Sequence, residues 1–549
     1  MCDPNLNNKN DLPKFLPYIL ALGLFLTLII AGSSLFKDFG VPIDETYQRQ
    51  IALKNHTYIF NHDPSLLSFK DRYYGVTFEL PLFWMSTRFA EPDAVYYRHL
   101  LLYLAFLVSL AVFYLIGLRL FRNPWWSLLA VGLLAFSPRI FSDAFYNSKD
   151  IAFMDVYILA IGTLLLIIDK TRKQEWKFTI FLIFLHAFTS AILIGTRIVG
   201  TMIIPISMAF IGIAIYGSGD SWKKVLILSA LYLALTAGLT ILFWPILWHD
   251  PLREAINAFQ QMSKYLEYGK GVLYMGYLYP SDALPWQYLP VWIGISTPLI
   301  VLAGFLLGIS DWFSRMYLSF PKGKEKIGKG FFIWLSDQEM LQWLTILAWL
   351  IFPIVAIYWF NSVLYNGWRH LFFIYPAIVL FSTRGFSALH KHLSERTGRR
   401  TIGTIIIAVV LVIGLFEPLS YLARYHRYGT AYFNQLAGDT KTLRQRFEMD
   451  YWGLAYKEAI DYILATDPAD KIPIYMAEVS GPDYINSGLS PEEKARITIM
   501  DSPDTGAHYF IGNFSFHPDE YEYADFLPEY FSVNVRGAKI LVVYRFQQP

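Results

Sequence analysis

Residues 15–47, FLPYILALGLFLTLIIAGSSLFKDFGVPIDETY, join an apolar run to an acidic pair and decide the fold. The apolar run, 15–36, holds 22 residues and no charge. It is too long for the core of a signal peptide, lacks a clear small-residue cleavage site, and is long enough to cross a hydrocarbon layer of ~30 Å. We interpret it as a retained transmembrane helix, which brings Asp44 and Glu45 to a membrane surface.

The composition of the whole chain is that of a membrane protein. Of its 549 residues, 55% are hydrophobic and 16% are charged. The net charge of +2 comes without a block of basic residues, so nucleic acid is not an expected partner. Cys2 is the one cysteine, which excludes an internal disulfide framework and a cysteine-ligated zinc site.

Runs long enough to span a bilayer recur through the first three quarters of the sequence. They lie at 15–36, 99–120, 124–141, 151–169, 177–195, 198–216, 224–247, 287–310, 341–360, 369–386 and 401–422. This pattern predicts a polytopic α-helical membrane protein with about eleven transmembrane helices in a domain that covers 1–422. Because the number is odd, we expect the two termini on opposite sides.

Lys and Arg fall on every second loop, which predicts the orientation because positive residues near helix ends stay on the cytoplasmic side. The basic loops contain Arg119 and Arg122; Lys170, Arg172, Lys173 and Lys177; Lys223 and Lys224; 315–329; and 384–400. These loops and the N-terminus are therefore predicted to be cytoplasmic. Segments 37–98, 142–150, 248–286, 361–368 and everything after Tyr421 are predicted to be external.

The external segments differ in character. Loop 37–98 is helical over 44–60 and has enough aromatic and aliphatic residues over 73–89 to lie along the membrane surface, and loop 248–286 has a similar mixture. Residues 423–549 have the composition of a small soluble α/β domain on the external side. Its expected helices are 440–447 and 456–465, and its expected strands are 472–477, 495–500, 507–514 and 538–546, with a hairpin turn at Arg536 and Gly537.

Ionisable side chains are almost absent from the predicted spans. His186 and Asp155 are the exceptions, and a lone histidine in a helix is more often packed and hydrogen-bonded than functional. Polar residues gather instead at five external turns: Asp44 and Glu45; Asp143, Lys149 and Asp150; Arg197; His249; Arg369 and His370. Each has a structural explanation alone, as a helix cap, a snorkelling anchor or an interfacial residue. Together they predict an external interfacial site.

The chemistry that fits this site is transfer of a sugar from a lipid phosphate. Asp44 is the candidate general base toward an attacking hydroxyl. Cations neutralise a departing phosphate, and the candidates are Lys149, Arg197, Arg369 and His370. Nucleotide sugars are cytoplasmic, so an outward-facing enzyme needs a donor carried on a polyprenyl or dolichyl phosphate. The expected acceptor is a hydroxyl of a protein, a glycan or a lipid.

Several short stretches resemble those of the GT-C membrane glycosyltransferases. Residues 42–45 resemble the Asp-Glu motif of the protein O-mannosyltransferases of glycosyltransferase family 39. Stretches similar to those of microbial mannosyltransferase-like and aminoarabinose-transferase-like relatives lie at 136–150, 195–200, 367–376, 432–438 and 450–453. The resemblance implies that Asp44 is the catalytic base, with Glu45 as a second acidic group, in the plasma membrane of a prokaryote.

The same resemblance leaves cofactors open. Some members of the class bind a divalent metal between acidic and His residues of the first two external loops, and others need none. This sequence offers six such side chains without a fixed ligand spacing: Asp44, Glu45, His56, His62, Asp143 and Asp150. The metal therefore stays unknown.

A transporter, or a flippase of lipid-linked sugars without catalysis, is the alternative function. It predicts ionisable residues near the middle of the bilayer, broken helices in corresponding positions and an internal repeat. None of the three is evident in the sequence.

Overall fold

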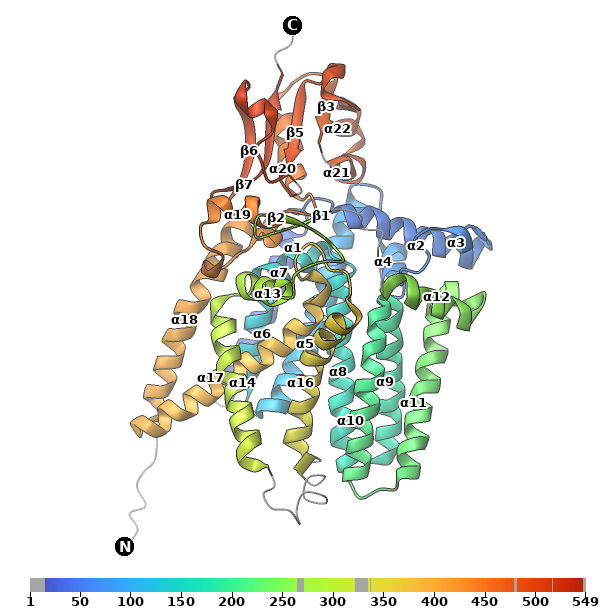
Figure 1. Cartoon of the computed structure of the whole chain (residues 1–549), viewed down its shortest axis with the longest axis vertical. Helices are drawn as coiled ribbons and strands as arrows, with labels where there is room; N and C mark the ends of the chain where they lie inside the picture. The colour runs from blue at the N-terminus through green and yellow to red at the C-terminus, as the bar shows by residue number, and fades with distance from the viewer. Residues whose placement is uncertain are drawn as a thin grey trace.

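A bundle of long helices beneath a small sheet domain makes up the chain (Figure 1). The computed structural model describes residues 15–263, 271–320, 334–335, 337–477, 481–515 and 517–546. Within these ranges, 10 helices are long and apolar enough to cross a membrane, or 11 if one bent pair counts as a span. The predicted fold class, a polytopic α-helical membrane protein with a small C-terminal α/β domain, is confirmed.

The spanning helices differ in how deeply they are buried. They are α1 (Leu16–Leu35), α5 (Asp93–Phe121), α8 (Asp150–Arg172), α9 (Trp176–Thr196), η1 and α10 (Ile198–Met202 and Ile203–Gly217), α11 (Trp222–Phe243), α14 (Leu299–Ser319), α16 (Gln338–Phe360), η5 and α17 (Arg369–Ile374 and Tyr375–Thr397), and α18 (Arg400–Tyr425). In the apolar window of α8, 89% of the residues are buried, against 17% for α1 and α18. Helix α8 is therefore a central element, and it begins at Asp150.

The predicted span 124–141 is wrong as a single straight helix. It consists of α6 (Pro124–Ala135) and α7 (Pro138–Tyr146), bent by 67°. Pro138 causes the break, because proline lacks an N–H for the helix ladder and disfavours helical backbone in the residue before it. As a result, Asp143 lies on a buried helix and not in an external loop.

The predicted span 287–310 is also wrong in its bounds. A short helix, α13 (Tyr288–Ser296), ends before Pro298, and the spanning helix α14 begins at Leu299 and continues to Ser319. Arg315, expected to open a basic loop, therefore lies within α14. Residues 321–329 of that loop and 264–270 of the predicted loop 248–286 lie outside the described residues.

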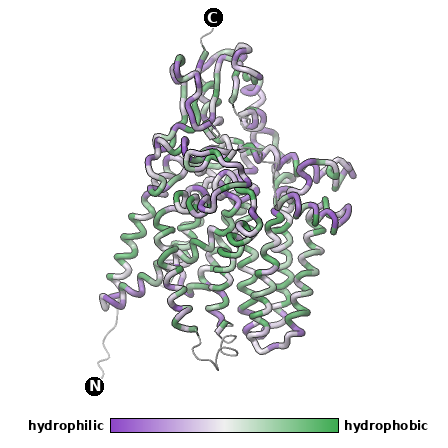
Figure 2. Tube along the Cα trace, in the orientation of Figure 1, coloured by the Kyte–Doolittle hydropathy of each residue, from purple (hydrophilic) through white to green (hydrophobic). Residues whose placement is uncertain are grey.

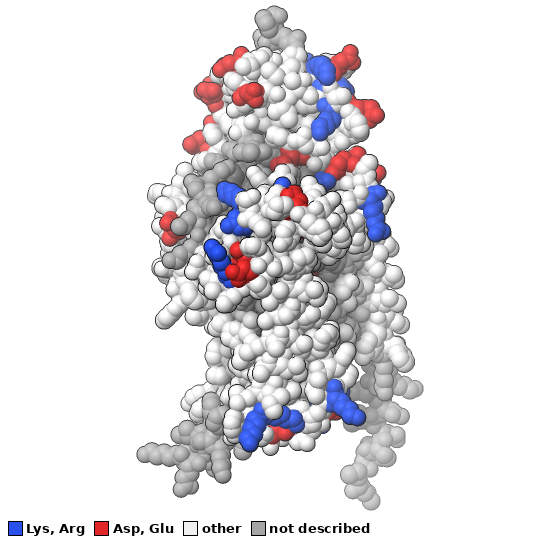
Figure 3. Space-filling view, turned by 90° about the vertical axis from the view of Figure 1, so that its right-hand side faces the viewer, with Lys and Arg blue, Asp and Glu red and all other residues white. Residues whose placement is uncertain are grey.

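The helical bundle has an apolar girdle. The lower helices are predominantly hydrophobic in Figure 2, and Figure 3 shows a band without charges between the charged lower rim and the charged upper half of one face. The basic ends of several helices meet away from the sheet domain: Arg172 at the end of α8 donates to the carbonyl of Gly217 (3.2 Å), and Lys224 lies over the Trp176 ring. This is the end that the positive-inside rule assigns to the cytoplasm.

The opposite end carries short elements on top of the bundle (Figure 1). They are α2 (Ile43–Asn61), α3 (Ser65–Ser68), α4 (Glu79–Ser86), η2 (Pro245–Trp248), α12 (Pro251–Ser263) and a hairpin of β1 (Gly271–Tyr274) with β2 (Tyr277–Pro280). The helix expected over 44–60 is confirmed as α2, and 73–89 contains α4. The hairpin was not predicted.

The C-terminal domain contains a five-stranded sheet in the order β4-β3-β5-β7-β6. Its elements after α18 are η6 (His426–Ala431), η7 (Gln435–Ala437), η8 (Thr440–Thr442), α19 (Leu443–Arg446), α20 (Ala455–Thr466), β3 (Ile472–Met476), α21 (Gly481–Ser487), α22 (Pro491–Arg496), β4 (Ile497–Ile499), η9 (Pro503–Thr505), β5 (Tyr509–Asn513), η10 (Glu522–Asp525), β6 (Glu529–Val535) and β7 (Ala538–Arg545). The hairpin turn at Arg536 and Gly537 is confirmed, with φ of 52° and 88° as a tight turn between antiparallel strands requires. The main apolar core continues from the bundle into this domain.

Candidate functional site

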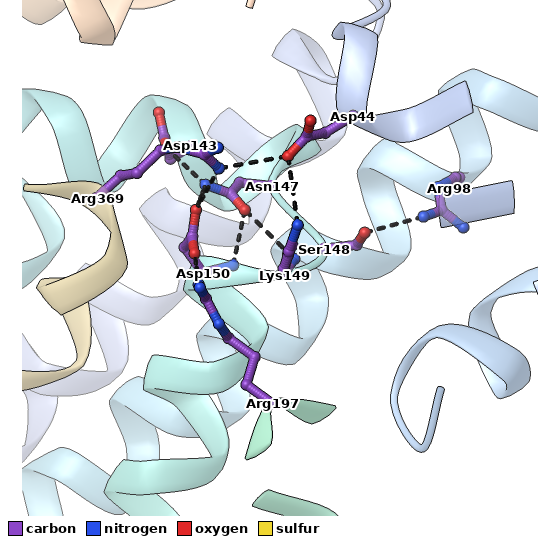
Figure 4. Close-up of polar contacts among 9 residues, drawn as sticks. All are labelled: Asp44, Arg98, Asp143, Asn147, Ser148, Lys149, Asp150, Arg197 and Arg369. Carbon is purple, nitrogen blue, oxygen red and sulfur yellow. Dashed lines mark hydrogen bonds and ion pairs between the residues drawn. The ribbon is translucent and has the colours of Figure 1, made fainter. Parts of the chain in front are cut away.

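Arg369 joins two carboxylates from different elements at the top of the bundle (Figure 4). Its Nη1 lies 2.9 Å from Asp150 Oδ2 at the start of α8 and 3.3 Å from Asp44 Oδ2 on α2. The Asp150 side chain is 1% exposed, whereas that of Asp44 is 28% exposed. Asp44 therefore combines an ionic partner with a surface that another molecule can reach.

The buried Asp150 carboxylate is held from several directions. Besides Arg369 it is paired with Arg197, which follows the last residue of α9. The Asn147 amide donates to Asp150 Oδ2 (3.2 Å), and its carbonyl oxygen accepts from the Asp150 backbone N–H (2.8 Å). Buried charges persist when they are paired and hydrogen-bonded in this way. The two guanidinium groups are consequently fixed in place.

Asp143 belongs to the layer behind this cluster. It is fully buried, accepts a hydrogen bond from the Tyr146 hydroxyl (2.7 Å) and another from the Asn147 amide (2.9 Å). Because Asn147 also contacts Asp150, Asp143 orients the amide that helps to fix Asp150.

Lys149 is the third cation of the site. Its Nζ lies 3.8 Å from Asp44 Oδ2 and 4.3 Å from the centre of the Tyr74 ring. Burial lowers the pKa of Lys149 to about 8, against the opposing pull of Asp44. Burial also lowers the pKa of Arg197 to about 10. Both groups are charged in the majority of molecules at neutral pH.

Burial and charge act in opposite directions on Asp44. Burial raises the pKa of its carboxyl, but the Lys149 and Arg369 cations outweigh it, so the pKa lies below its ordinary value. Asp44 is therefore ionised at neutral pH. The three cations Lys149, Arg197 and Arg369 then face two carboxylates, which gives the cluster a net positive charge suited to an anion.

Glu45 does not take part in this cluster. Its carboxylate is buried against α5, 3.2 Å from Arg98 Nε and 3.0 Å from His99 Nε2. Arg98 also binds Glu79 (2.7 Å) and the Ser148 hydroxyl (3.0 Å). The structure thus separates the predicted acidic pair, with Asp44 facing the cations and Glu45 anchoring α2 to α5.

A mainly apolar cavity of about 340 Å³ ends at this cluster. Its polar lining includes Lys149, Arg197 and His370, while much of the remaining wall comes from η1, α16 and residues 362–365. Phe352 and Phe360 of α16 line the cavity and are 39% and 55% exposed. The cavity therefore extends from the cations to the surface of the bundle that faces lipid.

His370 and His249 are placed differently. The His370 ring meets the Tyr365 ring edge-on at 4.6 Å and lines the cavity. His249 is exposed after η2, and none of the contacts described joins it to the charged cluster. Among the described residues, no three His, Cys, Asp or Glu side chains converge as a metal-binding group.

The sequence did not single out several residues that shape the site. Asn147 and Tyr74 touch the charged residues directly, and the Trp452 ring lies 4.5 Å from the Arg369 guanidinium. Asn147 lies between two predicted site residues, and its place before a helix start was a usable signal. Tyr74 and Trp452 lie outside the hydrophobic runs, and the pattern of those runs does not predict which residues pack against them.

No protein-family model matches the sequence, and no curated protein matches it. The fold is similar to two crystal structures of ArnT from Cupriavidus metallidurans, one bound to undecaprenyl phosphate and one in the apo state. ArnT is an aminoarabinose transferase of the GT-C class. The TM-scores are 0.48 and 0.45 at 12% identity, over 97% and 95% of this chain and 98% of each ArnT chain.

Proposed function

We propose that this protein is an integral-membrane glycosyltransferase. It transfers a sugar from a polyprenyl-phosphate or dolichyl-phosphate donor to an acceptor hydroxyl on the external face. One observation carries the proposal: an apolar cavity that reaches the lipid-facing surface ends at clustered cations, beside an accessible carboxylate.

The cations match the phosphate of such a donor. Arg197 and Arg369 are fixed by Asp150, so their guanidinium groups keep a defined position toward a bound phosphate. Lys149 adds a compact charge at the polar end of the apolar cavity. A site that is already organised before reaction stabilises developing charge without reorganisation.

The cavity matches the isoprenoid chain. Its walls combine aliphatic and aromatic side chains, and exposed Phe352 and Phe360 mark its lipid-facing side. A chain that enters from the bilayer exchanges one apolar environment for another, so the phosphate contacts fix the position of the donor.

Asp44 supplies the base. The acceptor hydroxyl gives its proton to the Asp44 carboxylate while its oxygen forms a bond to the anomeric carbon. The bond between that carbon and the phosphate oxygen breaks, and its electron pair leaves with the polyprenyl phosphate. Lys149, Arg197 and Arg369 stabilise the extra negative charge on the phosphate, and Asp44 later releases its proton to solvent. Asp44 suits this role better than Asp150 because its side chain is 28% and not 1% exposed.

The distribution of basic residues supports a reaction on the external face. The basic helix ends lie opposite the site, and the positive-inside rule assigns them to the cytoplasm. With the N-terminus cytoplasmic and the C-terminal domain external, the donor must be carried across the membrane before use. The plasma membrane of a prokaryote is the proposed location.

Purified protein in liposomes tests the function. Wild type is incubated with radiolabelled polyprenyl-phosphate sugars and with protein, glycan and lipid acceptors, and binding of undecaprenyl phosphate is compared with that of undecaprenol. The proposal predicts phosphate-dependent binding and transfer of label to one acceptor class. Movement of the labelled lipid between leaflets without any transfer would instead identify a flippase.

A further inference from the structure

A rigid turn of the C-terminal domain lies directly against the charged cluster. Asp450 and Gly453 have positive φ, 43° and 74°. The Asp450 carboxylate accepts from the N–H groups of Leu454 (2.9 Å) and Ala455 (3.0 Å) and from the Asn513 amide (3.0 Å). These bonds tie the turn to the start of α20 and the end of β5, so its conformation is fixed by the sheet domain.

This turn holds the segment that carries Asp44. The Trp452 carbonyl accepts a hydrogen bond from the Ile43 N–H at 3.2 Å, one residue before Asp44. Gly40 packs closely on Leu454, two residues after Trp452, since a Cβ on Gly40 would lie 2.7 Å from the Leu454 carbonyl oxygen. The beginning of α2 is therefore pinned by backbone contacts to the C-terminal domain.

The Trp452 side chain holds the other half of the site. Its ring lies 4.5 Å from the Arg369 guanidinium and is 2% exposed. It also meets the Tyr146 ring edge-on at 6.4 Å, and Tyr146 donates to Asp143. A guanidinium over an aromatic face is held more strongly when both are removed from water. One residue thus contacts both Arg369 and the backbone beside Asp44.

We propose that Trp452 is a positioning residue for the transfer site, and that the C-terminal domain completes this site instead of merely resting on the bundle. Trp452 orients Arg369 toward the lipid phosphate through its ring and fixes Asp44 through its carbonyl group. The inference rests on the proposed function where it concerns the phosphate, while the contact with α2 is independent of it.

The aromatic face of Trp452, and not its indole N–H, orients Arg369. The Trp452 Nε1 has no hydrogen-bond partner among the described residues. Trp452→Phe therefore keeps the ring beneath Arg369, whereas Trp452→Leu and Trp452→Met keep apolar volume without a π face. Trp349→Leu is the matched control, because Trp349 is also fully buried with an unpartnered Nε1 and stacks on Tyr157.

Three measurements on the full-length protein in detergent test the proposal: affinity for undecaprenyl phosphate, thermal stability, and hydrogen exchange of a peptide covering 40–50. Trp452→Leu and Trp452→Met are expected to weaken binding about tenfold, the loss of ~1.4 kcal/mol, and to speed exchange at 40–50. Trp452→Phe should bind undecaprenyl phosphate with nearly wild-type affinity. Trp349→Leu should lower thermal stability while leaving affinity and exchange at 40–50 unchanged.

The outcomes separate this inference from the proposed function. Wild-type affinity in Trp452→Leu, or equal losses in the Phe and Leu variants, would overturn the positioning role of the ring. If wild type itself does not bind undecaprenyl phosphate, the proposed function fails. Hydrogen exchange at 40–50 then tests the positioning role of Trp452 on its own. Faster exchange at 40–50 in Trp452→Leu but not in Trp349→Leu then supports it, and unchanged exchange overturns it.

Discussion

The Asp150 carboxylate and the Arg369 guanidinium lie 2.9 Å apart although 219 positions separate them in the chain. Asp150 is the first residue of α8, and Arg369 is the first residue of η5, which leads into α17; the apolar windows of both spans are 89% buried. Their contact locks two spanning elements together at the external end. It also leaves Arg369 within reach of Asp44, so one guanidinium connects the fixed and the accessible carboxylate.

Arg369→Lys should weaken binding of undecaprenyl phosphate by about 10- to 100-fold, because a lysine cannot contact two carboxylates and a phosphate with a planar fork. Isothermal titration or a fluorescent lipid analogue measures this change. Arg384→Lys is the control, since Arg384 is also buried, pairs with Asp311 at 2.9 Å and lies over Trp343 at 4.6 Å, but stands in the middle of α17, away from the charged cluster. Equal losses in both variants would mean a general effect on folding.

Lys149 predicts a pH dependence of lipid-phosphate binding. Its pKa of about 8 means that the charged form, which attracts phosphate, is lost as the pH rises through about 8. Affinity measured between pH 6 and pH 10 should therefore fall on the alkaline side. Lys149→Arg should move this fall to higher pH, because a guanidinium stays protonated. If affinity depended on pH in the same way in wild type and in Lys149→Arg, the alkaline fall could not be assigned to Lys149.

Glu45→Gln should act on stability more than on chemistry. It removes one partner of a buried ionic network with Arg98 and His99, a change that costs ~3 kcal/mol or more. A thermal scan in detergent should show a clear drop. Glu395→Gln serves as the control, because the Lys391–Glu395 pair is more than 60% exposed and should contribute ~0.5 kcal/mol at most. A stable Glu45→Gln protein without transferase activity would return Glu45 to a catalytic role.

Ala356→Phe should obstruct the apolar cavity. Ala356 is buried in its wall on α16, and a phenyl group there would fill space that the isoprenoid chain needs, so affinity for undecaprenyl phosphate should fall roughly tenfold, or ~1.4 kcal/mol. The neighbouring Val355→Phe should have no such effect, because Val355 is 53% exposed on the lipid-facing surface. Binding curves for a long and a short isoprenoid phosphate measure the difference. Identical affinities in the two variants would exclude the cavity as the site of the chain.

The sequence predicted the positions of Asp44, Lys149, Asp150, Arg197 and Arg369 because each stands at the end of an apolar run. The length of a run fixes the depth of the residues at its ends, and the alternation of basic loops assigns those ends to one side. Five turns from distant parts of the chain were thus expected at one surface, and the structure joins charged residues of four of them. His249, of the fifth turn, makes none of these contacts.

Side-chain direction and helix breaks were harder to predict. Asp44 and Glu45 are neighbours on α2, where successive residues point about 100° apart, so one faces the cations and the other faces Arg98. From hydropathy alone, 124–141 and 287–310 were each predicted as one continuous helix, although Pro138 and Pro298 indicated the breaks. The contact between Trp452 and Arg369 depends on how two domains dock, which no local pattern encodes.

The central claim is that Asp44 takes the proton from the acceptor while the cations hold the phosphate. The most direct measurement compares wild type with Asp44→Asn in two assays, binding of undecaprenyl phosphate and sugar transfer from a polyprenyl-phosphate donor. We predict that the variant binds the lipid phosphate at least as well as wild type, because a negative charge near the phosphate is removed. Transfer should fall by about 10²- to 10⁴-fold, the usual contribution of a general base. Undiminished transfer by Asp44→Asn would contradict the account.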